Sequence, residues 1–313
     1  MDQTRQVLTS LGLPERDRTD LPASTQRFPD GGQYRIEIPS VEGPNALRMV
    51  YETADALGVP IHRVSQGSGV MLLTDDELDE MAALGRERGI EVSLFVGPRA
   101  GWDTGAMAYM PAGRIVAPKV RGMDQLVHAV EDVRRANEHG ITSVLVTDEG
   151  LLWVLGEMRT RGELPADFIF KGSVMLGASN PASITLLQRL GLTTFNTPTD
   201  LSLAQLAAIR QAVTMPLDIY IEVPDDIGGF VRHYEIAEIV RVAAPVYLKF
   251  GLRNAPNIYP SGTHLEATAV ALTRERVRRA KIGLDLLHRL DPDAVMSPVP
   301  QGNALLSSTD GRA

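Results

Sequence analysis

The sequence predicts a (β/α)8 barrel, and three observations lead to this prediction. Short apolar segments rich in β-branched residues alternate with amphipathic helical segments, at a spacing of about 25 residues in the central part of the chain. Eight such strand–helix units can be counted, which is the number that a closed barrel of this kind requires. No strand is followed by the glycine-rich fingerprint of dinucleotide-binding folds, so the alternative, an open doubly wound sheet, is less favoured.

The pattern is clearest in residues 168–222. Residues 168–174 are apolar and β-branched, as expected of a buried strand. Asn180 and Pro181 then open a helix, and Gly191 ends it. A strand, a helix and a third strand follow, which makes this stretch a β-α-β-α-β unit and predicts parallel strands.

The other elements follow the same rules in chain order. The expected strands are residues 33–38, 61–66, 91–96, 143–147, 168–174, 193–196, 217–222 and 246–250. The expected helices are residues 44–57, 75–88, 123–138, 151–161, 233–242 and 263–290, with two more that begin after Asn180 and Asp200. Gly58 ends the first helix, and Thr74 with Glu77 forms a capping box before the second. Asp200 is the expected N-cap of its helix.

This pattern divides the chain into three parts. Residues 1–32 form an arm that we expect to pack on the domain or on a partner subunit. Residues 33–290 form a single barrel domain, and the Pro-, Ser- and Gly-rich residues 291–313 are expected to be a disordered tail. Within the barrel, residues 97–122 are a long insert rich in Gly, Ala and Met, of the kind that often serves as a lid or binding loop.

Composition excludes several classes of function. The chain has 31 basic and 39 acidic residues, a net charge of −8, which disfavours a nucleic-acid partner. It has no cysteine, which excludes disulfides, iron–sulfur clusters and thiolate catalysis. No apolar run approaches the roughly 20 residues of a membrane span, and the N-terminus lacks the apolar core of a signal peptide. We therefore expect a cytoplasmic protein without a membrane partner.

The candidate active site follows from the fold, because barrel enzymes carry their sites at the carboxyl ends of the strands. Polar residues stand at or just after these ends: Glu37, Ser65 with Gln66, Arg99, Asp148 with Glu149, Lys171, Asn196, Glu222 and Lys249. Apolar neighbours flank Lys171, Glu222 and Lys249, so alternation predicts that these charges point into the barrel mouth. Together with Glu37 they form either a catalytic set or an interior salt-bridge network.

A catalytic role for this set has two forms. A desolvated lysine can act as a base or form a Schiff base, and Lys171 is the first candidate, with Lys249 the second. Alternatively, Glu37, Glu149 and Glu222 hold a hard divalent cation such as Mg²⁺, whose ligands are oxygens.

The substrate is expected to be small and polar or anionic. The loops after the last two strands lie in the quadrant of a barrel that often holds an anion, and there Arg253 and Asn254 stand beside free backbone amides. Arg99 and Asn196 complete the predicted substrate-binding set. The basic run at residues 274–281 is interpreted as a solvated helix face or as a contact within a homo-oligomer.

Residues 180–223 resemble the collagenase-like peptidases of family U32. The matching features are Asn180 at a helix start, Leu190 with Gly191 at its end, and the segments 200–203 and 209–214. The resemblance implies a barrel core, a hydrolytic activity and a peptide or other small substrate. Where that family has a His-Gly-Ala-(Leu/Met)-Cys signature, this chain reads Glu-Val-Pro-Asp, so the resemblance supports the fold and leaves the chemistry open.

The sequence is therefore compatible with two hypotheses about function. In the first, the protein is a barrel enzyme, hydrolase-like or of the lyase/aldolase type, with residues 97–122 closing over its substrate. In the second, it is a non-catalytic scaffold whose interior charges neutralise one another.

Overall fold

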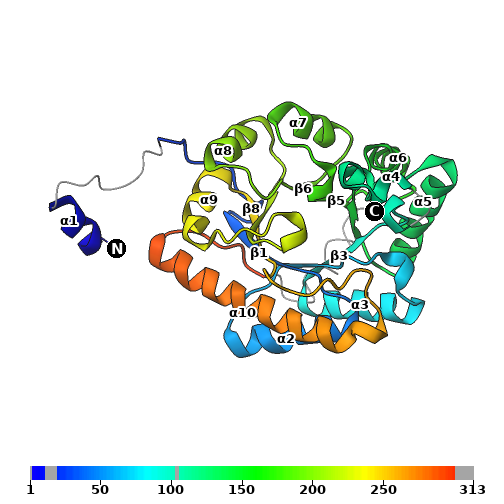
Figure 1. Ribbon diagram of the computed structural model, residues 1–313, viewed down its shortest axis with the longest axis horizontal. Coiled ribbons are helices and arrows are strands. Elements are labelled where there is room, and N and C mark those ends of the chain that lie inside the picture. The colour runs from blue at the N-terminus through cyan, green and yellow to red at the C-terminus, as the bar shows by residue number, and fades with distance from the viewer. Residues whose placement is uncertain (1, 11–19, 103–105, 300–313) are drawn as a thin grey trace, which may run out of the picture.

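Eight parallel strands close into a barrel in chain order in the computed structural model, which describes residues 2–10, 20–102 and 106–299 (Figure 1). The strands are β1 (Tyr34–Pro39), β2 (Arg63–Ser65), β3 (Glu91–Phe95), β4 (Ser143–Val146), β5 (Ile169–Gly172), β6 (Thr194–Asn196), β7 (Leu217–Glu222) and β8 (Val246–Phe250). Parallel pairing of β1 with β8 closes the ring. The predicted (β/α)8 barrel is confirmed.

Apart from the amino-terminal helix, the helices lie around the outside of the strands (Figure 1). They are α1 (Asp2–Ser10), α2 (Pro44–Leu57), α3 (Asp75–Arg88), α4 (Ala106–Tyr109), α5 (Gly122–Glu138), α6 (Glu149–Thr160), α7 (Pro181–Arg189), α8 (Leu203–Ala212), α9 (Ile236–Ala243) and α10 (Glu266–Leu290). None of the described helices combines the length and the apolar composition that crossing a bilayer requires.

Local capping signals explain several helix boundaries. The capping box of Thr74 and Glu77 is confirmed at the start of α3, and Gly58 ends α2 in the left-handed conformation with φ of 63°. The prediction that Asp200 caps α8 is wrong. Ser202 is the N-cap, because its side chain accepts the Gln205 amide while the Gln205 side chain accepts the Ser202 amide, which satisfies two backbone donors at once.

Two segments cover the amino-terminal end of the barrel. Phe28, which is buried, packs edge-on against Tyr247 of β8. The Ser297 amide donates to the carbonyl of Tyr34 in β1, at 3.0 Å. Residues 291–299 are therefore folded against the barrel, whereas the rest of the predicted tail lies outside the described residues.

The insert between β3 and α5 contains short helical turns. Its described parts form a turn at Ala100–Trp102, the one-turn helix α4 and a further turn at Pro111–Val116. Its predicted role as a lid stays a prediction.

The barrel has an apolar outer core and a polar interior. Strand residues such as Ile36, Phe170 and Leu248 are fully buried in the apolar cluster that joins the strands to the helices. The alternate residues of the same strands face the barrel axis, and many of them are charged. Most barrels fill this space with branched apolar side chains, so the interior is where this chain departs from the common pattern.

Candidate functional site

The barrel interior holds a network of ion pairs. Glu37 of β1 lies at its centre: its carboxylate is 2.6 Å from Lys171 Nζ, 3.1 Å from Lys249 Nζ and 3.4 Å from the Arg63 guanidinium. Asp218 of β7 also pairs with Lys171 and lies 3.2 Å from Arg63. We call Glu37, Arg63, Lys171, Asp218 and Lys249 the interior cluster.

Neutral partners complete this network. Ser65 donates to Glu37 at 2.7 Å, Thr194 donates to Asp218 at 2.6 Å, and Lys249 donates to Asn196 at 3.0 Å. Glu91 pairs with Arg63 at 2.8 Å, so three basic groups face three acidic ones. The interior is therefore balanced in charge.

Burial and ion pairing shift the pKa values of these groups in opposite directions. Burial lowers the pKa of Lys171 to about 8, against the opposing effect of Asp218 and Glu37. Burial alone would raise the pKa of Glu37, but Lys171, Lys249 and Arg63 outweigh it and hold that pKa well below its usual range. Glu37 and Lys171 have no solvent-exposed surface. The cluster is thus a neutralised core rather than an open site.

Of the predicted catalytic set, Glu37, Lys171 and Lys249 come together and Glu222 does not. The register of β7 against β8 is irregular between Tyr220 and Glu222, so simple alternation fails at the end of this strand. Glu222 instead lies 3.6 Å from His233 and 3.5 Å from Arg279 of α10. The prediction that it joins the barrel lysines is wrong for this reason.

The predicted metal ligands do not converge either. Glu37 belongs to the interior cluster and Glu222 lies beside α10. Glu149 is the exposed first residue of α6 and pairs with Lys119 at 2.7 Å. Across residues 2–10, 20–102 and 106–299, no group of three or more His, Asp or Glu side chains is arranged to hold a metal ion.

The predicted substrate-binding residues are dispersed. Asn196 is part of the interior network. The Arg99 guanidinium lies 3.4 Å from the centroid of the Phe95 ring and donates to the Gly67 carbonyl. Arg253 is half exposed and pairs with Asp225 at 3.2 Å, and the Asn254 amide donates to the same carboxylate.

Arg63 and Asp218 were not among the predicted site residues, because both lie within predicted strands and the prediction considered only the carboxyl ends of strands. The signal that could have found them is alternation itself. Arg63 and Ser65 alternate with Val64, and Asp218 and Tyr220 alternate with Ile219.

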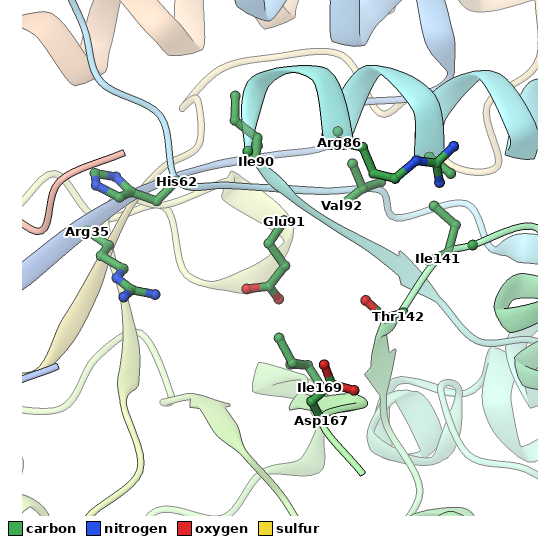
Figure 2. Close-up of a pocket in the computed structure, with 14 residues that line it drawn as sticks. Arg35, His62, Arg86, Ile90, Glu91, Val92, Ile141, Thr142, Asp167 and Ile169 are labelled. Atoms are coloured by element: carbon green, nitrogen blue, oxygen red, sulfur yellow. The ribbon is translucent and has the colours of Figure 1, made fainter. Parts of the chain in front are cut away.

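A hollow of about 290 Å³ opens at the amino-terminal end of the strands. Figure 2 shows Arg35, Glu91 and Asp167 around it. Arg35 pairs with Asp30 at 2.8 Å, and Glu91 pairs with Arg63 of the interior cluster. Arg35 and Glu91 are therefore already paired, and the other charged residues of its wall, Arg86 and Asp167, are exposed, so no buried charge of this hollow requires a ligand.

A second pocket, of about 250 Å³, lies at the carboxyl-terminal end, and we call it the mouth pocket. Its wall consists of Ser40 after β1, residues 224–226 after β7, residues 252 and 255–259 after β8, and Arg276 of α10. Helix α10 runs along the outside of the barrel beside α2 (Figure 1). The mouth pocket is therefore at the end of the barrel where enzymes of this fold bind their substrates.

Arg276 is the unusual member of this wall. Its side chain is 4% exposed, its Nη1 donates to the Ser40 carbonyl at 3.1 Å, and its Nε has no hydrogen-bond partner. No acidic side chain of the described chain forms an ion pair with it. Burial lowers its pKa, against the weaker opposing effect of Tyr259 and Glu42. A buried cation without an ion pair is costly, and an anion bound in direct contact would reduce that cost.

Ser40 joins two other parts of this wall. The Tyr259 hydroxyl donates to Ser40 Oγ, while the Ser40 carbonyl accepts Arg276. Ser40 has a φ of 59°, a left-handed conformation that is uncommon for a serine and that occurs often at functional sites. Burial raises the pKa of Tyr259, so its phenol stays protonated at neutral pH and acts as a donor.

Comparisons with known proteins add nothing beyond the fold. No family model and no curated protein sequence matches the chain. A U32 peptidase structure is 15% identical over 76% of this chain and 96% of its own, with a TM-score of 0.39.

Two enzyme structures are similar to about the same degree. A thiamine phosphate pyrophosphorylase from Pyrococcus furiosus is 12% identical over 80% of this chain and 98% of its own, with a TM-score of 0.41. An oxaloacetate acetylhydrolase is 11% identical over 85% of each chain, with a TM-score of 0.47. These values concern fold alone, so the chain is not assigned to the U32 family.

Proposed function

We propose that this barrel is an enzyme that takes a small anionic substrate into the mouth pocket. Arg276 binds the anionic group, and the paired hydroxyls of Ser40 and Tyr259 lie beside it as proton donors. A protonated phenol suits a step in which a leaving group or a developing oxyanion needs a proton, as in hydrolysis and in lyase reactions.

One observation carries this proposal: Arg276 is buried, lines a pocket and forms no ion pair with an acidic side chain of the described residues, since Glu42 acts on it only at longer range. The predicted anion site at Arg253 is less suitable, because that side chain is half exposed and already paired with Asp225. We therefore propose Arg276 of α10 as the anion-binding residue, instead of Arg253 in the loop after β8.

The interior lysines have a supporting role in this proposal. Lys171 has no exposed surface and contacts two carboxylates, so a Schiff base on it would require the amine to leave both. Lys249 lies 4.4 Å from the centroid of the Tyr220 ring and also pairs with Glu37. Their charges hold the strands that carry the mouth pocket in place.

The test is turnover of a substrate panel, followed by proton NMR. The panel contains short carboxylic acids, phosphate esters, amides and dipeptides at millimolar concentration. We expect the wild-type protein to convert at least one anionic member. Arg276→Gln should lower kcat/KM at least 100-fold, about 2.7 kcal/mol, and Tyr259→Phe should lower mainly kcat.

Arg278→Gln is the matched control, because Arg278 is on the same helix but is mostly exposed and pairs with Glu275 at 3.0 Å. It should leave turnover unchanged. Conversion of a neutral substrate only, or equal turnover by Arg276→Gln, would contradict the proposal.

A further inference from the structure

We infer that the substrate of the mouth pocket is a small zwitterion, which presents an anionic group to Arg276 and an ammonium group to Asp226. This inference rests on the proposed function and narrows its substrate class.

The mouth pocket has two poles of opposite charge. The buried pole is Arg276 on α10, described above. The outer pole is the pair Asp225 and Asp226, in the turn after β7. Both poles line the same pocket, so a single ligand could contact both.

The two carboxylates of the outer pole differ in their partners. Asp225 accepts Arg253 Nε at 3.2 Å and the Asn254 amide, so its charge is already compensated. Asp226 lines the pocket without a basic partner among the described residues. Although Asp226 is exposed on its outer side, desolvation by its surroundings raises its pKa, with a contribution from the neighbouring Asp225. A bound ammonium group would stabilise this carboxylate.

The charge of the outer pole disfavours a simple anion. Asp226 lines the same pocket as Arg276, so a second negative charge on an acid bound there would be repelled by Asp226. An ammonium group at that end turns this repulsion into attraction. The two poles therefore select a ligand with opposite charges at its ends over a mono- or dianion of the same length.

The size of the pocket limits the ligand. About 250 Å³ corresponds to roughly eight water molecules at ~30 Å³ each, so the pocket surrounds a group the size of a short amino acid and a longer ligand would extend out of it. The chemical class is therefore a short aminocarboxylic acid, free or as the end group of a small amide.

The test uses matched ligands in isothermal titration calorimetry at low salt. The probes are the ω-amino acids from glycine to 5-aminopentanoate, the carboxylic acids of equal chain length, and the corresponding alkylamines. For one chain length we expect the amino acid to bind wild-type protein at least fivefold more tightly than the acid. Asp226→Asn should abolish that preference and leave the affinity for the acid unchanged or higher.

Two further variants separate this inference from the proposed function. Arg276→Gln should weaken binding of acids and amino acids alike, at least tenfold. Asp200→Asn removes an exposed charge from the same end of the barrel, in the loop after β6, and should change neither affinity. If acids bind through Arg276 and the amino group adds nothing, the inference is wrong and the proposed function stands. If neither acids nor amino acids bind, both are wrong.

Discussion

At the scale of single residues, His62 shows how one side chain joins distant segments. Its Nδ1 accepts the amide of Ile36 at 3.1 Å, and its Nε2 lies 2.8 Å from the carbonyl of Ser297. Both hydrogen bonds form together only when the ring is neutral with the proton on Nε2. Burial lowers the pKa of His62 to about 4, although the Ser297 carbonyl acts in the opposite direction.

This histidine predicts a dependence of stability on pH. Below pH 6.5 the unfolded chain takes up a proton at His62, while the folded protein does so only near pH 4. The free energy of unfolding should therefore fall by about 3 kcal/mol through this group as pH falls from 6.5 to 4. Urea denaturation of wild-type and His62→Asn protein at pH 7.5, 6, 5 and 4 measures the free energy of unfolding. His128→Asn is the control, because His128 is exposed. Parallel profiles for wild type and His62→Asn would rule the prediction out.

Some single residues of the site could be predicted from the sequence and others could not. Alternation at strand ends found Glu37, Lys171 and Lys249, because a charge between two apolar residues of a strand must face the barrel axis. Arg276 could not be found in this way. It stands in a basic run beside Val277, and only the packing of α10 on the barrel decides which arginine of that run is buried.

At the scale of elements, the loop after β8 is tied to the loop after β2. Glu42 accepts the Gly67 amide at 2.7 Å and the Ser68 hydroxyl at 2.6 Å, and Ser68 Oγ accepts the Ser261 amide at 2.7 Å. The Tyr259 ring lies directly over Gly67, where an added Cβ would be 2.4 Å from a ring carbon. One wall of the mouth pocket therefore depends on a glycine in a different loop.

Gly67→Ala should displace the loop after β8. We expect trypsin to cleave after Arg253 at least fivefold faster, because the new methyl group forces Tyr259 out of its place. Mass spectrometry of timed digests measures the rate. Gly262→Ala is the control, since its methyl group would meet only the His264 side chain, at 3.3 Å. Equal cleavage of Gly67→Ala and wild-type protein would show that the loop does not depend on this contact.

Element boundaries were predictable where local chemistry sets them. The bounds of α2 and α3 match the prediction. Residues next to these helices set them: a glycine follows α2, and α3 has a cap at each end. The irregularity at the end of β7 was not predictable, because it depends on pairing with β8, about 30 residues away in the chain. The placement of Glu222 followed from that pairing.

At the scale of the whole molecule, the interior cluster joins strands from both halves of the barrel. Lys171 of β5 bridges Glu37 of β1 and Asp218 of β7, so one side chain links three strands. The number of strand–helix units predicted the closed barrel. The ion pairs on its axis could not be predicted in this way, because they depend on how distant strands are placed around the barrel.

Lys171→Met tests the role of the cluster. Removing this cation leaves two buried carboxylates with less compensation, so we expect a loss of about 3 to 5 kcal/mol in the free energy of unfolding. Binding at the mouth pocket should persist under conditions where the variant is folded. Lys281→Met is the control, because Lys281 is partly exposed and forms a surface pair with Asp285, worth less than about 1 kcal/mol. A stable Lys171→Met protein without turnover would instead favour a catalytic lysine.

The most direct measurement of the central claim is a crystal structure of the protein soaked with 3-bromopropionate, located by the anomalous signal of bromine. The chain has no cysteine for such a reagent to alkylate. The account predicts that the strongest bromine peak lies in the mouth pocket, with the carboxylate on Arg276, and that Arg276→Gln crystals lack it. An empty mouth pocket with the carboxylate bound elsewhere, for example at Arg253, would contradict the account.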